Sequence, residues 1–373
     1  MEFRDLKKQY EALKPELDDA MAKVASGAHY IMGPEVGQLE EELEEYTGVR
    51  HCISCANGTD ALQLALMVWG VGPGDAVFVP DFTFFSSAEV VAAVGATPVF
   101  VDVDAETFNI DPEDLERAVR ETFADGRLTP RVVIGVDLFG LPAQWHKISE
   151  IAKRYGLLTL EDGAQGFGGG IGGRKACSFA DIATTSFFPA KPLGCYGDGG
   201  AVFTDNDEWA ELLRSYRVHG KGTCKYDNVR IGMNSRLDTI QAAILQVKLK
   251  AFREYELQDI DAAAAFYSEQ LAGMVGTPAV PEGFTSSWAQ YTIRLSDKST
   301  REGLQASLKA RGIPSMVYYP TPMSAQTAFA GMPRRECPTV AKLCDTVLSL
   351  PISPYITKEQ QQEVIHSVKE YVG

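Results

Sequence analysis

The first 50 residues carry a hydrophobic pattern with a helical period. In residues 3–25 apolar side chains recur among charged neighbours at a spacing close to that of a helix, which we expect Gly27 to end. An irregular segment at 29–34 precedes a second, acidic helix at about 35–46. We expect the six glutamates of this second helix to form a solvated face rather than a metal site.

From residue 50 onward, short apolar segments alternate with helical ones. Helical patterns lie at residues 61–69, 86–94, 112–122 and 145–155. The apolar segments between them are short and rich in β-branched residues, as buried strands are. The predicted strands are 51–55, 76–79, 98–103, 132–138, 157–161, 183–188 and 201–204. This alternation predicts a mostly parallel, seven-stranded α/β sheet with helices on both faces.

The pattern changes again near residue 250. A helical stretch at 251–272 is followed by a strand-like segment at 289–295 and an amphipathic helix at 300–311. We therefore expect a large α/β domain at 1–250, which includes the N-terminal helix, and a smaller α+β domain at 251–373.

Composition narrows the possible partners. Hydrophobic residues make up 45% and charged residues 23% of the chain, as in ordinary soluble globular proteins. The net charge of −15 argues against nucleic acid or an anionic membrane as a partner. Neither a signal peptide nor an apolar segment of membrane-spanning length is visible. The seven scattered cysteines indicate reduced thiols, and hence a cytoplasmic protein.

Two motifs lack the partners that would give them a function. Cys52 and Cys55 have the spacing of a zinc site, but no second pair or suitably spaced histidine accompanies them. We interpret them as core thiols and predict no metal site. Residues 168–173 contain G-x-G-x-x-G but do not open a helix directly after a strand, so we expect a flexible turn rather than a nicotinamide site.

Polar and aromatic residues follow several predicted strands at the edge where ligands of such sheets bind. Asn57, Gly58 and Thr59 follow the first strand and open a helix, where backbone N–H groups can bind phosphate, although a plain helix cap has the same pattern. An aromatic cluster at 81–86 follows the second strand; its phenylalanines belong to the core or stack on a flat ring. Residues 161–165 place a carboxylate after the fifth strand, where it can stabilise a protonated ring nitrogen.

Lys191 lies just beyond the sixth strand. The prolines and glycines after Ser186 end regular structure, so Lys191 is held in a tight loop between Ala190 and Pro192. An ordinary lysine has a pKa of about 10.4, but an apolar loop favours the neutral amine, which is a nucleophile for Schiff-base chemistry. A solvated loop lysine is the alternative. Phosphate cradle, stacking ring, carboxylate and amine at one edge together meet the requirements of pyridoxal phosphate (PLP).

At these residues the sequence resembles the DegT/DnrJ/EryC1/StrS sugar aminotransferase family, within the fold type I PLP enzymes. Its members that aminate C3 of a UDP-linked 3-keto-hexuronic acid (UDP-2-acetamido-2-deoxy-3-oxo-glucuronate), for surface polysaccharide such as O-antigen, are the most similar. The matching segments occur in family order. They are NGTDAL (57–62), FTF (82–84), EDGAQ (161–165), SFFPAK (186–191) and GMNSRLD (232–238).

The resemblance implies roles for individual residues. Lys191 would hold PLP covalently and move the proton, and Asp162 would pair with the pyridinium nitrogen. Gln165 would lie near the ring hydroxyl, and Phe84 would stack on the ring. The phosphate would be bound by Gly58, Thr59 and Ser186.

The resemblance also implies a homodimer with shared sites. Asn234 and Arg236 would reach the neighbouring subunit's cofactor and substrate, although they can equally be a cap and a surface charge before the helix at 239–249. Tyr318 and Tyr319 would contact substrate; many relatives carry histidine at position 318, which puts that contact in doubt.

The implied reaction takes an amino group from a donor amino acid, expected to be glutamate, and gives it to a nucleotide-linked keto sugar. Amination at C4 of a 4-keto-6-deoxy sugar is the alternative within the family. A sugar dehydrase is disfavoured because that branch has histidine in place of the lysine. A non-catalytic, sugar-sensing regulator remains the alternative from another functional class.

Overall fold

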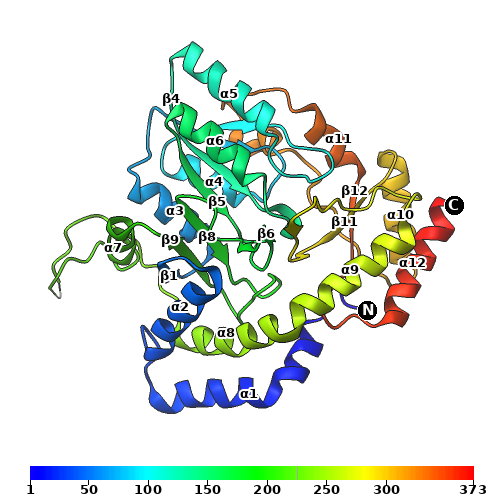
Figure 1. Cartoon of the computed structure of the whole chain (residues 1–373), viewed down its shortest axis with the longest axis horizontal. Coiled ribbons are helices and arrows are strands. Elements are labelled where there is room, and N and C mark those ends of the chain that lie inside the picture. Colours follow the sequence, from blue (N-terminus) through cyan, green and yellow to red (C-terminus); the bar gives the residue numbers. More distant parts are fainter. Residues whose placement is uncertain (225) are drawn as a thin grey trace.

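A seven-stranded sheet forms the centre of the computed structural model, which describes residues 1–224 and 226–373 (Figure 1). The strand order is β1-β9-β8-β5-β4-β2-β3, and β9 runs antiparallel to the other six strands. The predicted, mostly parallel sheet is confirmed. The strands are β1 (His51–Cys55), β2 (Asp75–Pro80), β3 (Thr97–Val101), β4 (Thr129–Val136), β5 (Leu158–Asp162), β8 (Ile182–Ser186) and β9 (Gly200–Thr204).

Helices cover both faces of this sheet. One face packs against α3 (Gly58–Val68), α4 (Ser86–Ala93) and α7 (Asp207–Tyr216). The other packs against α2 (Pro34–Thr47), α5 (Pro112–Asp125), α6 (Trp145–Tyr155) and α8 (Thr239–Ala251). The two-sided burial explains why the strands are continuously apolar.

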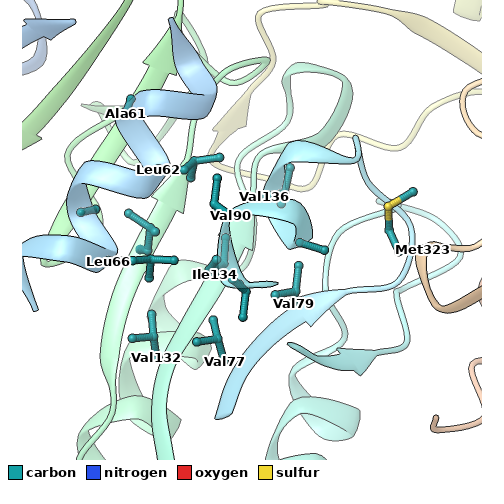
Figure 2. Packing of buried hydrophobic residues seen from close by; sticks show 14 of the residues in the cluster. Ala61, Leu62, Leu66, Val77, Val79, Val90, Val132, Ile134, Val136 and Met323 are labelled. Atoms are coloured by element: carbon teal, nitrogen blue, oxygen red, sulfur yellow. The ribbon is translucent and has the colours of Figure 1, made fainter. Parts of the chain in front are cut away.

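Successive side chains of a strand point to opposite faces of the sheet, so the apolar core has one part on each face. Val77 and Val79 of β2 join the cluster under α3, whereas Phe78 between them joins the cluster under α5 and α6. Figure 2 shows Leu62 and Leu66 of α3 lying over the valines of β2 and β4. The helix that opens beside the first strand end is thereby fixed to the sheet.

The N-terminal helix α1 (Leu6–Gly27) lies along α8 at the bottom of the view in Figure 1. Helix α8 continues through a π-helical turn, η2 (Phe252–Glu256), into α9 (Leu257–Leu271). The sequence suggested two separate helices here, and this prediction is wrong because the chain stays helical across residues 250–256.

The C-terminal part has its own apolar cluster. It packs α9, α10 (Lys298–Ala310) and α12 (Lys358–Val372) around the two-stranded sheet of β11 (Tyr291–Arg294) and β12 (Val347–Leu350). Met323, Phe329 and α11 (Pro338–Thr346) pack instead into the cluster under α3. The division at 250/251 stays a prediction.

Several local predictions have clear outcomes. Cys52 and Cys55 are fully buried, as expected of core thiols. Residues 168–173 belong to a hairpin of β6 (Gly170–Ile171) and β7 (Arg174–Lys175), with positive φ at both turn glycines; β6 also pairs with β10 (Phe284–Thr285). No described group of three His, Cys, Asp or Glu side chains is arranged to hold a metal ion. Within the described chain, no helix is both long enough and apolar enough to span a bilayer.

The acidic helix α2 is not the uniformly solvated surface that the sequence suggests. Glu40 accepts hydrogen bonds from the backbone and hydroxyl of Ser54 and from Arg217, and Glu44 accepts one from the Cys52 backbone. Arg217 Nη1 lies 2.6 Å from Glu40 Oε1, and their side chains are 6% and 14% exposed. This ion pair joins α2, β1 and the end of α7. The predicted solvated face is therefore wrong at Glu40, because Arg217, distant in sequence, is its partner.

We expect Arg217→Met to lower the free energy of unfolding by about 3–5 kcal/mol, because it leaves the Glu40 carboxylate buried without its cation. Arg253→Met is the matched control: Arg253 pairs with Glu45 of the same helix across 3.4 Å in an exposed position. Its loss should cost less than about 1 kcal/mol. Urea unfolding of both variants checks this, and equal midpoints would contradict it.

Candidate active site

A cavity of about 680 Å³ opens beyond the carboxyl ends of β1, β5 and β8. Larger hollows of about 770 and 1030 Å³ lie elsewhere on the described chain, so volume does not distinguish this cavity. The residues that line the cavity distinguish it. Of the predicted site residues, the cavity is lined by Gly58, Thr59, Phe84, Asp162, Gln165, Ser186, Lys191, Tyr318 and Tyr319.

The start of α3 and the end of β8 form a narrow polar cradle. Asn57 caps the helix by accepting a hydrogen bond from Asp60 N at 2.8 Å. A Cβ on Gly58 would lie 2.7 Å from Ser186 Cβ, so only glycine lets the two elements approach this closely. Thr59 Oγ1 lies 2.8 Å from Ser86 Oγ. Hydroxyls and free N–H groups at this helix start suit a phosphate.

Asp162, the last residue of β5, is held from two sides. Ser87 Oγ donates to Asp162 Oδ2 at 2.7 Å, and Ala164 N donates to Oδ1 at 3.2 Å. Thr83 Oγ1 in turn lies 3.0 Å from Ser87 Oγ. With 6% of its surface exposed, Asp162 presents a fixed carboxylate to the cavity.

Lys191 lies in the tight loop that the prolines and glycines predict. Its backbone N–H donates to Phe188 O at 2.8 Å, and the loop is closed by Cys195 N donating to Phe187 O at 2.8 Å. Burial lowers the pKa of the Lys191 amine, an effect that Asp162 opposes and Arg4 reinforces. The expected shift toward the neutral amine is confirmed in direction.

The remaining wall is amide and aromatic. Gln165 Oε1 accepts from Phe139 N at 2.6 Å, and its Nε2 donates to Tyr319 OH at 3.1 Å. Burial raises the pKa of Tyr319, so its hydroxyl stays protonated near neutral pH. Tyr318 packs edge-on against Tyr319, with ring centroids 5.8 Å apart.

Two phenylalanines of the aromatic cluster differ in exposure. Phe82 is 1% exposed and packs against Phe139 and Tyr319 in the core. Phe84 is 54% exposed and lies on the cavity wall. Its stacking on a bound ring stays a prediction.

Asn234 and Arg236 do not line this cavity. Asn234 is exposed and bridges to Val218, and Arg236 lines the separate hollow of about 1030 Å³. Sequence reasoning also missed residues that the structure adds to the site, above all Ser87, which orients Asp162. Ser87 could have been found from the sequence, because it lies two residues after Phe85 at the start of a helix that follows a strand. Hydroxyl residues at such a helix start indicate a polar edge of the sheet.

The residues present fit pyridoxal phosphate. The cradle that a Cβ on Gly58 would fill suits the phosphate, and the carboxylate of Asp162 suits a protonated ring nitrogen. The amine of Lys191, with its lowered pKa, suits covalent attachment to an aldehyde.

Comparisons with known proteins agree with this assignment. The model of the DegT/DnrJ/EryC1/StrS aminotransferase family matches residues 11–369. The chain is 45% identical to a UDP-2-acetamido-2-deoxy-3-oxo-D-glucuronate aminotransferase of Pseudomonas aeruginosa, over 95% of this chain and 96% of the relative.

Solved structures agree as well. A DegT DnrJ EryC1 StrS aminotransferase from Brucella abortus is 48% identical, with a TM-score of 0.97 over 100% of both chains. The ntda protein of Bacillus subtilis, solved with bound cofactor PMP, is 28% identical, with a TM-score of 0.87 over 97% of this chain and 82% of that one. The chain therefore belongs to the DegT/DnrJ/EryC1/StrS aminotransferase family.

Proposed function

We propose that this PLP-dependent aminotransferase moves an amino group from glutamate to the C3 keto group of a UDP-linked 3-keto-hexuronic acid. The observation that carries the proposal is the meeting of a fixed carboxylate, Asp162, and the amine of Lys191 in one cavity beside an anion cradle. The choice of sugar is supported by the relative from Pseudomonas aeruginosa, whose name describes a 3-oxo-glucuronate substrate.

When bound, PLP supplies an electron-withdrawing ring that stabilises negative charge on the substrate carbon. Gly58, Thr59 and Ser186 would hold its phosphate. Asp162 would keep the ring nitrogen protonated, and Ser87 fixes the direction of that carboxylate by donating to Oδ2.

Lys191 would attach the cofactor and afterwards act as the general base. A base works best with a pKa near the working pH, and burial moves the pKa of this amine in that direction. Asp162 counteracts the shift, so the two charges set the basicity together. Tyr318, Tyr319 and Phe84 would shield the reacting carbon from water.

The second subunit would complete the site. Arg236 lies beside a loop that exposes Val229 (55%) and Ile231 (89%), and exposed apolar side chains of this kind are typical of a covered interface. We propose a homodimer in which Asn234 and Arg236 of each chain reach the partner's cavity. A guanidinium binds a sugar carboxylate in bidentate fashion.

The same proposal places the enzyme in the cytoplasm, in the synthesis of a surface polysaccharide such as O-antigen. The seven cysteines are free thiols, which suits a reducing compartment. The following test distinguishes this function from amination at C4 and from a regulatory role without catalysis.

The purified protein is incubated with glutamate and a panel of nucleotide-linked keto sugars, and products are identified by mass spectrometry. We expect 3-amino product from the UDP-3-keto-hexuronate and 2-oxoglutarate in equal amount, with none from Lys191→Ala. Product from a 4-keto-6-deoxy sugar alone would favour the C4 alternative. A folded, cofactor-loaded protein that aminates no sugar would favour the regulator.

Mixing Lys191→Ala with Arg236→Ala subunits tests the shared site. Each variant alone should be nearly inactive, but equal mixing should restore about one quarter of the wild-type rate, because half of the dimers are mixed and each has one intact site. Lys191→Ala mixed with Asp162→Asn is the control, and it should restore nothing because both residues belong to the same chain's cavity. Native mass spectrometry must detect the mixed dimers. Mixed dimers of the first pair that stay inactive would place Arg236 in its own chain's site or in the fold.

A further inference from the structure

The side chain of Lys248, on α8, is almost fully buried, with 1% of its surface exposed. Burial lowers the pKa of its amine to about 8, against the effect of Glu256, so the amine is still mostly protonated at neutral pH. Lysine is seldom buried in proteins unless its ammonium group has partners. The reaction proposed above gives Lys248 no task, so the partners of its amine indicate what it does.

The hydrogen bond and the ring contact of this amine both lie in the loop that carries Lys191. Lys248 Nζ donates to Gly194 O and lies 5.0 Å from the centroid of the Tyr196 ring. No backbone N–H of the described chain donates to Gly194 O. Gly194 is buried, and a buried carbonyl without a donor costs free energy, so this part of the loop depends on Lys248.

A second side chain of α8 holds the same part of the loop. Gln241 Oε1 accepts a hydrogen bond from Tyr196 N at 2.8 Å. Gln241 and Lys248 are about two helical turns apart, so they lie on one face of α8. Apolar side chains of α8 and of the loop also share one buried cluster. One face of the helix therefore holds the loop through two hydrogen bonds and apolar packing.

The part of the loop that Lys248 holds lies against the residues that precede Lys191. A Cβ on Gly194 would lie 2.5 Å from Pro189 O and 2.7 Å from Phe188 O, so the backbone of residue 194 packs directly on that of residues 188–189. Lys191 N itself donates to Phe188 O at 2.8 Å. A displacement of Gly194 would therefore also displace Lys191, whose side chain lines the cavity.

We propose that Lys248 is a positioning residue, which fixes the loop to α8 and thereby holds the Lys191 amine in place for proton transfer. The inference rests on the proposed function, in which Lys191 is the general base. A base transfers a proton efficiently only from the correct position, and a misplacement of about 1 Å can slow a reaction about 100-fold. Loss of Lys248 should therefore affect the rate of proton transfer more than the binding of substrate.

Two measurements on the cofactor-loaded protein test this role. Lys248→Met removes the amine and keeps an unbranched side chain, and Lys250→Met is the matched control because Lys250 is exposed on the same helix. Hydrogen–deuterium exchange measures how firmly the loop is held and needs no substrate. Single-turnover nitrogen transfer from glutamate, with hydrogen or deuterium on its α carbon, measures the proton-transfer step.

In Lys248→Met we expect exchange to rise about 10-fold in the peptide that spans residues 187–199, and to stay unchanged in peptides of β1 and α12. The transfer rate at saturating glutamate should fall about 10- to 100-fold, while the half-saturating concentration changes less than about threefold. The deuterium isotope effect should increase, because proton transfer limits the rate more strongly. Lys250→Met should match wild type. Gln241→Met, which removes only the second hydrogen bond, should show the same changes at smaller size, so it tests the proposal even if Lys248→Met does not fold.

Loop exchange and transfer rates equal to those of wild type would overturn the proposal. So would faster exchange in every peptide together with a lowered urea midpoint, since that pattern marks a general structural role. A slower transfer without a larger isotope effect would also overturn it, because the defect would then lie at another step. If the wild-type protein takes no nitrogen from glutamate, the proposed donor has failed, while loop exchange still tests whether Lys248 holds the loop.

Discussion

Asp162 at the end of β5 and Lys191 beyond the end of β8 bring opposite charges into one cavity, where little water screens them. Burial favours the neutral lysine and the carboxylate favours the charged one, so the basicity of the amine depends on where both groups are held. Three features hold the two groups in place: the pairing of β5 with β8, the hydrogen bond from Ser87 to Asp162, and the closed loop around Lys191.

The electrostatics of the site differ from those of the whole chain. The net charge is −15, yet Lys191 and Lys248 both have a pKa lowered by burial, which Asp162 opposes at Lys191 and Glu256 opposes at Lys248. The amine of Lys248 donates to Gly194 O in the loop that holds Lys191. The N-terminal segment lies close to the cavity wall, because Phe3 packs edge-on against Tyr318 and α1 lies along α8.

Much of the fold and site follows from local sequence, and what was missed depends on distant contacts. The strand ends could be predicted to within two residues, because Gly, Pro, Asn or Asp lies at each end or up to three residues beyond it, and Gly58, Asp162 and Ser186 lie at or near those ends. The partner of Glu40 could not be predicted, since Arg217 lies 177 residues away along the chain.

The helix junction shows the same limit. The sequence predicts two helices that separate near residue 250, whereas α8 and α9 are joined by a π-helical turn at Phe252–Glu256 and the chain stays helical.

Borohydride reduction of the purified, cofactor-loaded enzyme, followed by peptide mapping, identifies the lysine that holds the cofactor. Reduction fixes the cofactor to that lysine, and we expect a pyridoxyl group on Lys191. Lys248 is the sharpest competitor, because it is 1% exposed and its pKa is also lowered by burial. Label on Lys248, or on an outlying lysine such as Lys175 or Lys221, with Lys191 unmodified, would show that Lys191 does not hold the cofactor.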